Sequence, residues 1–165
     1  MIYNLALVFD EDFHNEIFDF AQRLQIENDC EFEYTLTSVP HATLIKYESE
    51  ENPFKDIEGQ YTITISGLTL LPSRNDEDSG TWIELSVLIP DELRSKIASL
   101  VTDLDQDKLR SEIGDILRPH ITICKFSNQD SSKIPSLNPS LLRKSEVVAK
   151  LHAGSAGKGF SFSKS

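Results

Sequence analysis

Two short segments of the sequence repeat the same residue types in the same order. "PHATLIKY" occupies residues 40–47 and "PHITICKF" residues 119–126, so Pro, His, Thr and Lys recur while the residues between them change among apolar and aromatic types. Histidine can accept or donate a proton near neutral pH, because its ordinary pKa is about 6.5. Two histidines, each followed two residues later by a hydroxyl, are therefore candidates for paired acid–base chemistry.

Residues two apart in a β-strand point to the same face, so His41 shares a face with Thr43, and His120 shares one with Thr122. Splitting a phosphodiester requires a base for the attacking oxygen and an acid for the leaving oxygen, and histidine can serve as either. Threonine hydroxyls can donate hydrogen bonds to phosphate oxygens whose charge grows in the transition state. If the two strands meet across a cleft, the sequence predicts two catalytic histidines and two phosphate-binding threonines.

A structural interpretation competes with this one, because a single His-x-Thr in a strand is usually a packed histidine. Duplicated folding units also keep their apolar pattern for packing reasons, but here the apolar residues differ and His and Thr are identical, which favours function. Strict alternation places Lys46 and Lys125 on the face away from the histidines, as solvated residues near the strand ends. Alternation puts Cys124 on the His120 face, although a buried apolar role suits a cysteine better.

Neither motif supplies a second histidine or a carboxylate beside the first histidine, so we predict no metal and no cofactor. The chain has two cysteines, Cys30 and Cys124, and no CxxC pair. This excludes a disulfide framework and favours reduced thiols.

The repeat extends beyond the two motifs. Residues 5–13 align without a gap with residues 85–93, 80 positions later, and apolar residues at helical spacing follow each segment. The repeated unit is a strand, an acidic turn, an amphipathic helix and a His-x-Thr strand, covering about 5–47 and 85–126. Such a unit, present twice, predicts two related α+β halves within a single domain of residues 1–165.

Other segments complete the predicted fold. Residues 60–72 and 81–90 alternate as strands do and are predicted to pair as a hairpin. A short helix is possible near residues 141–144. Residues 146–151 and 159–162 could form a closing hairpin around a glycine-rich turn.

Composition limits the classes of protein that this chain can belong to. The 165 residues are 39% hydrophobic and 26% charged, as in an ordinary globular domain, and no apolar run reaches the roughly 18 residues of a membrane span. The N-terminus lacks the basic flank of a signal peptide, which favours the cytoplasm. The formal charge of −11 argues against coating long nucleic acids, but it allows a small phosphorylated ligand or an RNA end.

The segments "HATL" at 41–44 and "HITI" at 120–123 resemble the paired H-x-T-hydrophobic motifs of the two-histidine (2H) phosphoesterase superfamily. That superfamily includes the 2′-5′ RNA ligase-like proteins and the cyclic nucleotide phosphodiesterases. The resemblance implies a bilobal α+β fold with two antiparallel β-sheets facing a central groove, helices on the outer faces and one motif in each lobe. It also implies metal-free opening of 2′,3′-cyclic or 1″,2″-cyclic phosphates, with His41 as proton donor and His120 as the base. Lys125 stands where the RNA ligase-like branch often has arginine.

We therefore expect a monomeric cyclic phosphodiesterase whose partner is a small cyclic-phosphate nucleotide or an RNA terminus, without a membrane. One alternative is a non-catalytic module that binds a nucleotide or RNA end, although binding alone does not need two titrating groups. Another is an RNA-processing exonuclease of the same superfamily, which the negative charge disfavours because tracking a strand requires a basic groove.

The absence of a metal-ligand set in the motifs predicts that excess EDTA leaves activity on a 2′,3′-cyclic nucleotide unchanged. Initial rates measured with and without the chelator test this. Loss of activity with EDTA, restored by zinc or manganese, would contradict the prediction and move the site to another class.

Overall fold

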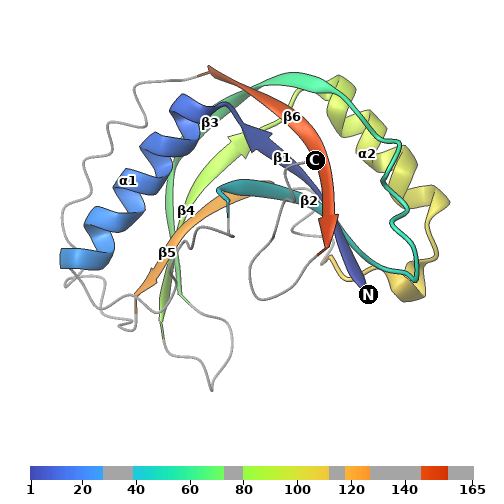
Figure 1. Cartoon of the computed structure of the whole chain (residues 1–165), viewed down its shortest axis with the longest axis horizontal. Coiled ribbons are helices and arrows are strands. Elements are labelled where there is room, and N and C mark those ends of the chain that lie inside the picture. The colour runs from blue at the N-terminus through green and yellow to red at the C-terminus, as the bar shows by residue number, and fades with distance from the viewer. Residues whose placement is uncertain (28–38, 73–79, 112–117, 127–145, 156–165) are drawn as a thin grey trace.

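The structure is a computed structural model, and it describes residues 1–27, 39–72, 80–111, 118–126 and 146–155. Within these ranges the chain forms six strands, two α-helices and one short 3-10 helix (Figure 1). In chain order they are β1 Ile2–Phe9, α1 Glu11–Glu27, β2 His41–Glu48, β3 Gln60–Pro72, β4 Thr81–Leu88, α2 Asp91–Asp103, η1 Gln106–Lys108, β5 His120–Phe126 and β6 Glu146–Ser155. The mixed α+β class is confirmed.

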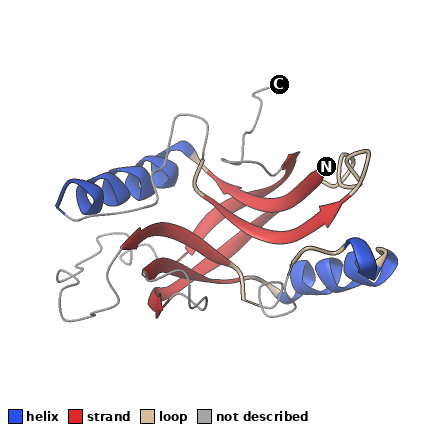
Figure 2. Cartoon of the chain, turned by 90° about the horizontal axis from the view of Figure 1, so that it is seen from below, coloured by secondary structure: helices blue, strands red, loops and turns tan. Residues whose placement is uncertain are grey.

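The six strands form one closed antiparallel barrel in the order β1-β2-β5-β4-β3-β6. This differs from the expected pair of separate facing sheets, because strand pairing is continuous around all six strands. The long strand β3 pairs through residues 60–64 with β6 and through residues 64–72 with β4, and β2 pairs with β5. Figure 2 shows the crossing strands with α1 and α2 on opposite sides of them.

The two longer helices begin at equivalent points of the repeat. Helix α1 starts at Glu11, where the carboxylate of Asp10 accepts a hydrogen bond from the backbone N–H of Phe13 at 2.8 Å. Helix α2 starts at Asp91, 80 residues later, directly after Pro90. Acidic residues occupy the first turn of both helices, where they interact favourably with the helix dipole. The predicted order of strand, acidic turn and helix is therefore present twice.

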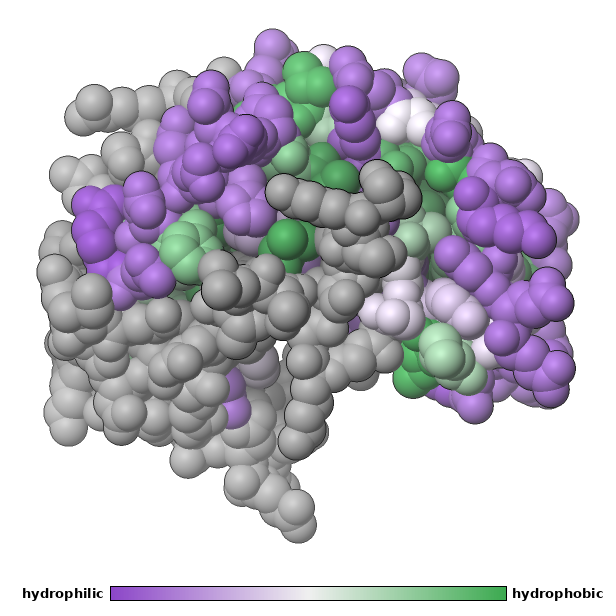
Figure 3. All heavy atoms as spheres, viewed as in Figure 1, coloured by the Kyte–Doolittle hydropathy of each residue, from purple (hydrophilic) through white to green (hydrophobic). Residues whose placement is uncertain are grey.

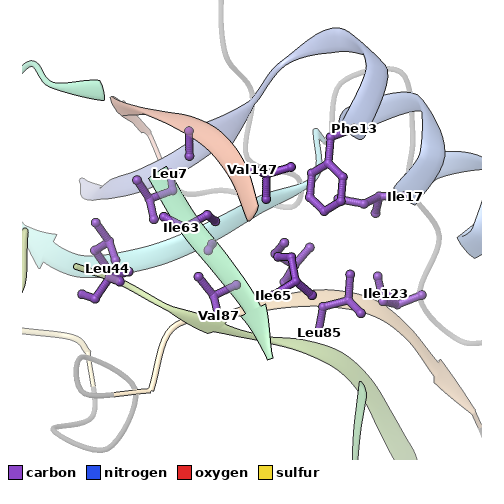
Figure 4. Close-up of a cluster of buried hydrophobic side chains, with 14 of the residues drawn as sticks. Leu7, Phe13, Ile17, Leu44, Ile63, Ile65, Leu85, Val87, Ile123 and Val147 are labelled. Carbon is purple, nitrogen blue, oxygen red and sulfur yellow. The ribbon is translucent and has the colours of Figure 1, made fainter. Parts of the chain in front are cut away.

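One face of the strands forms the hydrophobic core. Leu7, Leu85 and Ile121 are fully buried, and Phe13 and Ile17 of α1 point toward the strands (Figure 4). The surface over both helices is mainly hydrophilic when viewed as in Figure 1 (Figure 3). The helices thus cover apolar strand residues with one face and meet solvent with the other, as their amphipathic spacing predicts.

Several predicted segments have a definite outcome. The hairpin of β3 and β4 is confirmed, and β3 has the predicted bounds. Strand β6 covers the predicted segment 146–151, but it pairs with β1 and β3. The helix near 141–144, the segment 159–162 and Cys30 lie outside the described residues. In the part of the chain that is described, no helix is both long and apolar enough to cross a membrane.

Substitutions at Ile121 test the importance of the central strand contact for stability. Ile121 is fully buried, so we expect Ile121→Val to lower the free energy of unfolding by about 0.5–1.5 kcal/mol and Ile121→Ala by about 2–5 kcal/mol. Leu88→Ala is the control, because Leu88 is 54% exposed and should change stability by less than about 0.5 kcal/mol. Urea denaturation measures all three. Equal effects at the two positions would show that Ile121 does not belong to the cooperative core.

Candidate active site

The two His-x-Thr motifs lie on neighbouring strands. Strands β2 and β5 pair antiparallel through one residue pair, Ala42 with Ile121, which are the residues between His and Thr in each motif. Both are fully buried in the core. Because side chains alternate along a strand, the flanking histidines and threonines project from the opposite face. The antiparallel direction places Thr43 beside His120 and Thr122 beside His41 on this face, which we call the polar face.

The same register brings the two imidazoles close together. His41 and His120 are diagonal neighbours across the β2–β5 pair, and diagonal residues on antiparallel strands lie roughly 7–8 Å apart. All four motif side chains are half-buried. A phosphate group could therefore reach both histidines, whereas motifs at opposite ends of the barrel could not share a substrate.

The strand residues that face the first motif are apolar. His41 faces Val8 of β1, and Thr43 faces Ala6. Nδ1 of His41 donates a hydrogen bond to the backbone carbonyl of Val39 at 2.7 Å. Burial lowers the pKa of His41, the bond to Val39 opposes this, and the positive charges of Lys46 and His120 lower it further. The neutral imidazole, with its proton on Nδ1 and a lone pair on Nε2, is thus favoured.

His120 has polar and charged surroundings. It faces Ser86 of β4, while Thr122 faces Glu84. Nδ1 of His120 donates to the backbone carbonyl of Arg118 at 3.2 Å, and Nε2 lies 3.4 Å from Oε1 of Glu84. The second carboxylate oxygen of Glu84 accepts a hydrogen bond from Arg118 at 2.8 Å. Both nitrogens of the His120 ring therefore face acceptors.

Glu84 and Arg118 were not among the predicted site residues. Glu84 is only 6% exposed although it carries a carboxylate, and a buried carboxylate requires partners. Its position was readable from the sequence, because Ile83, Leu85 and Val87 alternate as core residues and leave Glu84 on the other face. That the other face of β4 is also the His120 face could not be read, because it depends on the pairing of β4 with β5.

A β-bulge follows each motif and reverses the predicted orientation of both lysines. The register along β1 shifts so that Leu44 is an extra residue of β2, and Ile123 is the extra residue of β5 opposite β4. One extra residue moves the following side chains to the other face. Lys46 and Lys125 consequently lie on the polar face with the histidines, and the prediction from strict alternation was wrong.

The second bulge also explains the positions of Cys124 and Lys125. Cys124 is fully buried in the hydrophobic core, which supports its apolar role and corrects its placement beside His120. Lys125 is 7% exposed, and its Nζ lies 5.4 Å from the ring centroid of Trp82, within the range of a cation–π interaction. Trp82 is the residue of β4 that faces Lys125.

Two further polar residues lie on this face. His152 of β6 faces Ala6, and burial lowers the pKa of His152. Asn4 of β1 faces Lys46, is buried, and its Oδ1 has no hydrogen-bond partner among the described residues. Neither was predicted, because each lies on a strand outside the motifs.

Within the described ranges, no group of three or more His, Cys, Asp or Glu side chains is arranged to hold a metal ion. The side chains gathered at the site are two imidazoles, two hydroxyls, a carboxylate and cationic groups. This set is suited to proton transfer at an anionic substrate.

Comparisons with protein-family models, with curated proteins and with solved structures find no match to this chain. The function of this chain is therefore inferred from the side chains of its site.

The bulge in β2 predicts that Lys46 affects the titration of His41. We expect Lys46→Met to raise the pKa of His41, because removing a nearby positive charge favours the imidazolium form. The matched control is Lys125→Met at the equivalent position of the second motif. Imidazole NMR signals followed as a function of pH measure the change. An unaltered His41 titration in the Lys46 variant would place that lysine away from the site.

Proposed function

We propose that the chain is a metal-independent phosphodiesterase of the 2H type that opens cyclic phosphates by acid–base catalysis. The observation that carries the proposal is the pairing of Ala42 with Ile121, which gathers two histidines and two threonines on one face. The substrate class is a 2′,3′-cyclic nucleotide, a cyclic phosphate at an RNA end, or a 1″,2″-cyclic phosphate.

The reaction adds one water molecule to the cyclic diester. One histidine accepts a proton from the water as its oxygen bonds to phosphorus, and the other histidine donates a proton to the ribose oxygen as the phosphorus–oxygen bond breaks. The hydroxyls of Thr43 and Thr122 are within reach of the non-bridging oxygens and stabilise their growing charge. The product is a phosphomonoester beside a free hydroxyl, and exchange with solvent returns both histidines to their starting states.

Two halves related by a pseudo-twofold axis are part of the proposal. Exchanging β1 with β4, β2 with β5 and β3 with β6 leaves the neighbour order of the barrel unchanged, which supports the relation. The bulge residues, Leu44 and Ile123, also occupy the same position of the two motifs. An axis through the β2–β5 pair would bring one motif from each half to a shared groove.

The charges near the site support a small anionic substrate over a long nucleic acid. The chain carries a formal charge of −11, yet Lys46 and Lys125 lie on the polar face and Arg118 pairs with Glu84 beside it. Such a local group of cations suits one or two phosphates, whereas a continuous strand requires a longer basic surface. We propose a monomeric cytoplasmic enzyme acting on small cyclic phosphates or RNA termini.

Substitution of the four motif residues tests the mechanism. We expect His41→Ala and His120→Ala each to lower kcat about 10²- to 10⁴-fold, as for loss of a general acid or base. Thr43→Val and Thr122→Val should lower it about 10- to 10³-fold, since each removes one transition-state hydrogen bond. Wild-type kcat/KM should be bell-shaped in pH, because one histidine must be neutral and the other protonated. Steady-state kinetics on 2′,3′-cyclic nucleotides measure these effects.

Two results would contradict the proposal in different ways. Full turnover in both histidine variants would make the paired motif a structural feature. Tight binding of cyclic phosphates by the wild type without any ring opening, measured by calorimetry beside the kinetics, would favour the binding-module alternative.

A further inference from the structure

The two histidines have unequal surroundings although their motifs are alike. The residues of the adjacent strand that face the first motif are Val8 and Ala6, which carry no polar side-chain atoms. Those that face the second motif are Ser86 and Glu84. An acid and a base require opposite protonation states in the same enzyme molecule. A protein can assign these two roles to similar groups by giving each group a different environment.

Each ring nitrogen of His120 faces an oxygen acceptor, one within hydrogen-bond distance and one at ion-pair distance. The carbonyl of Arg118 can only accept, so Nδ1 of His120 carries a proton in that contact. Oε1 of Glu84, 3.4 Å from Nε2, is also an acceptor, so a proton on Nε2 is stabilised as well. An imidazole with protons on both nitrogens is the cation.

Arg118 makes this arrangement compatible with an anionic substrate. Its guanidinium binds the other oxygen of Glu84 at 2.8 Å, which orients the carboxylate so that Oε1 faces His120. The same pair neutralises the carboxylate, which would otherwise repel a phosphate beside it. Arg118 therefore holds His120 through its own carbonyl and, indirectly, through Glu84.

We propose that Glu84 is a positioning residue that keeps a proton on Nε2 of His120, so that His120 is the general acid and His41 the general base. This inference rests on the proposed function and reverses the roles that the family resemblance implies. When the cyclic phosphate binds, Nε2 of His120 donates its proton to the leaving ribose oxygen as the phosphorus–oxygen bond breaks. Nε2 of His41 accepts the proton of the attacking water, because Nδ1 of that ring already donates to Val39.

The charged groups around the site are consistent with this division. Lys46, on the strand of His41, and His120, across the strand pair, disfavour the His41 cation, and burial lowers the pKa of His41 most. Beside His120 lie Glu84 of β4 and Arg118 of its own segment, and His41 of β2 is close enough to affect it electrostatically. Only Glu84 among them is an anion, and it lies in direct contact with the ring.

A leaving-group comparison tests the role of Glu84. The probes are 2′,3′-cyclic AMP, whose alkoxide leaving group needs an acid, and bis(4-nitrophenyl) phosphate, whose nitrophenolate leaves without one. We expect Glu84→Gln to lower kcat on the cyclic probe about 10- to 100-fold, as for loss of an outer hydrogen-bond partner. On the nitrophenyl ester the same variant should lose less than about threefold. His120→Ala should follow the same pattern, whereas His41→Ala should impair both reactions.

The pH profile and a matched variant separate this role from a structural one. Lys46→Met should move the acidic limb of kcat/KM to higher pH, because loss of this positive charge raises the pKa of His41, whereas Glu84→Gln should leave that limb in place. Glu48→Gln is the control, because Glu48 also pairs with an arginine, Arg110, but contacts neither histidine. Equal losses on both probes, or a shift of the acidic limb in the Glu84 variant, would overturn the assignment.

NMR titration distinguishes failure of this inference from failure of the proposed function. The imidazole signals of His41 should change below the ordinary histidine pKa, and at neutral pH the Nε2–H signal of His120 should be present in the wild type and lost in Glu84→Gln. These measurements need no turnover, so they test the assignment even if the wild type opens neither probe. An inactive wild type would refute the proposed function, whereas an active one whose His120 carries no proton on Nε2 would refute only the roles assigned here.

Discussion

The candidate site depends on one short contact between two strands. Strands β2 and β5 share a single residue pair, Ala42 with Ile121, and both side chains are fully buried. Because the strand period is two, burying these residues directs the flanking histidines and threonines to the opposite face. A slip of one residue at this contact would bury the imidazoles and expose the core. The apolar residue between His and Thr is thus as necessary to the arrangement as the polar residues.

The β-bulges beside this contact place two lysines on the polar face. Without Leu44 and Ile123 as extra residues, alternation would continue and direct both lysines away from the histidines. With them, Lys46 and Lys125 lie on the same face as the histidines. Bulges commonly redirect side chains near active sites, and here they add cationic groups without altering the His-x-Thr spacing. The extra residue of each bulge is itself part of the core, since Leu44 and Ile123 are buried.

The two histidines have different neighbours although their motifs are alike. Burial and neighbouring positive charge disfavour the cation at His41, whereas the carboxylate of Glu84 lies 3.4 Å from Nε2 of His120. Charges are screened beyond roughly 8 Å at physiological ionic strength, so these neighbours matter more than the net charge of the chain. An acidic protein can therefore have a site suited to a phosphate.

Patterns local to the chain were sufficient to predict much of the fold. The helices that start at Glu11 and Asp91, the bounds of β3 and the shared face of His and Thr within each motif follow from periodicity and acidic helix starts. Such signals depend on neighbouring residues, so they are present in the sequence. The four motif residues could be selected in the same way, because their types and spacing recur.

Closure of the barrel, the two bulges and the contact of Glu84 with His120 depended on the tertiary structure. A bulge is defined only against a partner strand, so alternation along one strand could not reveal the true face of Lys46. Glu84 and His120 are 36 positions apart in the sequence and meet because β4 pairs with β5. Strand pairing joins residues that are far apart in the sequence and depends on burial of the whole core. Periodicity, in contrast, is a local property of each segment. For that reason the sequence indicated which residues could do chemistry, and only the folded barrel determined which groups surround each histidine.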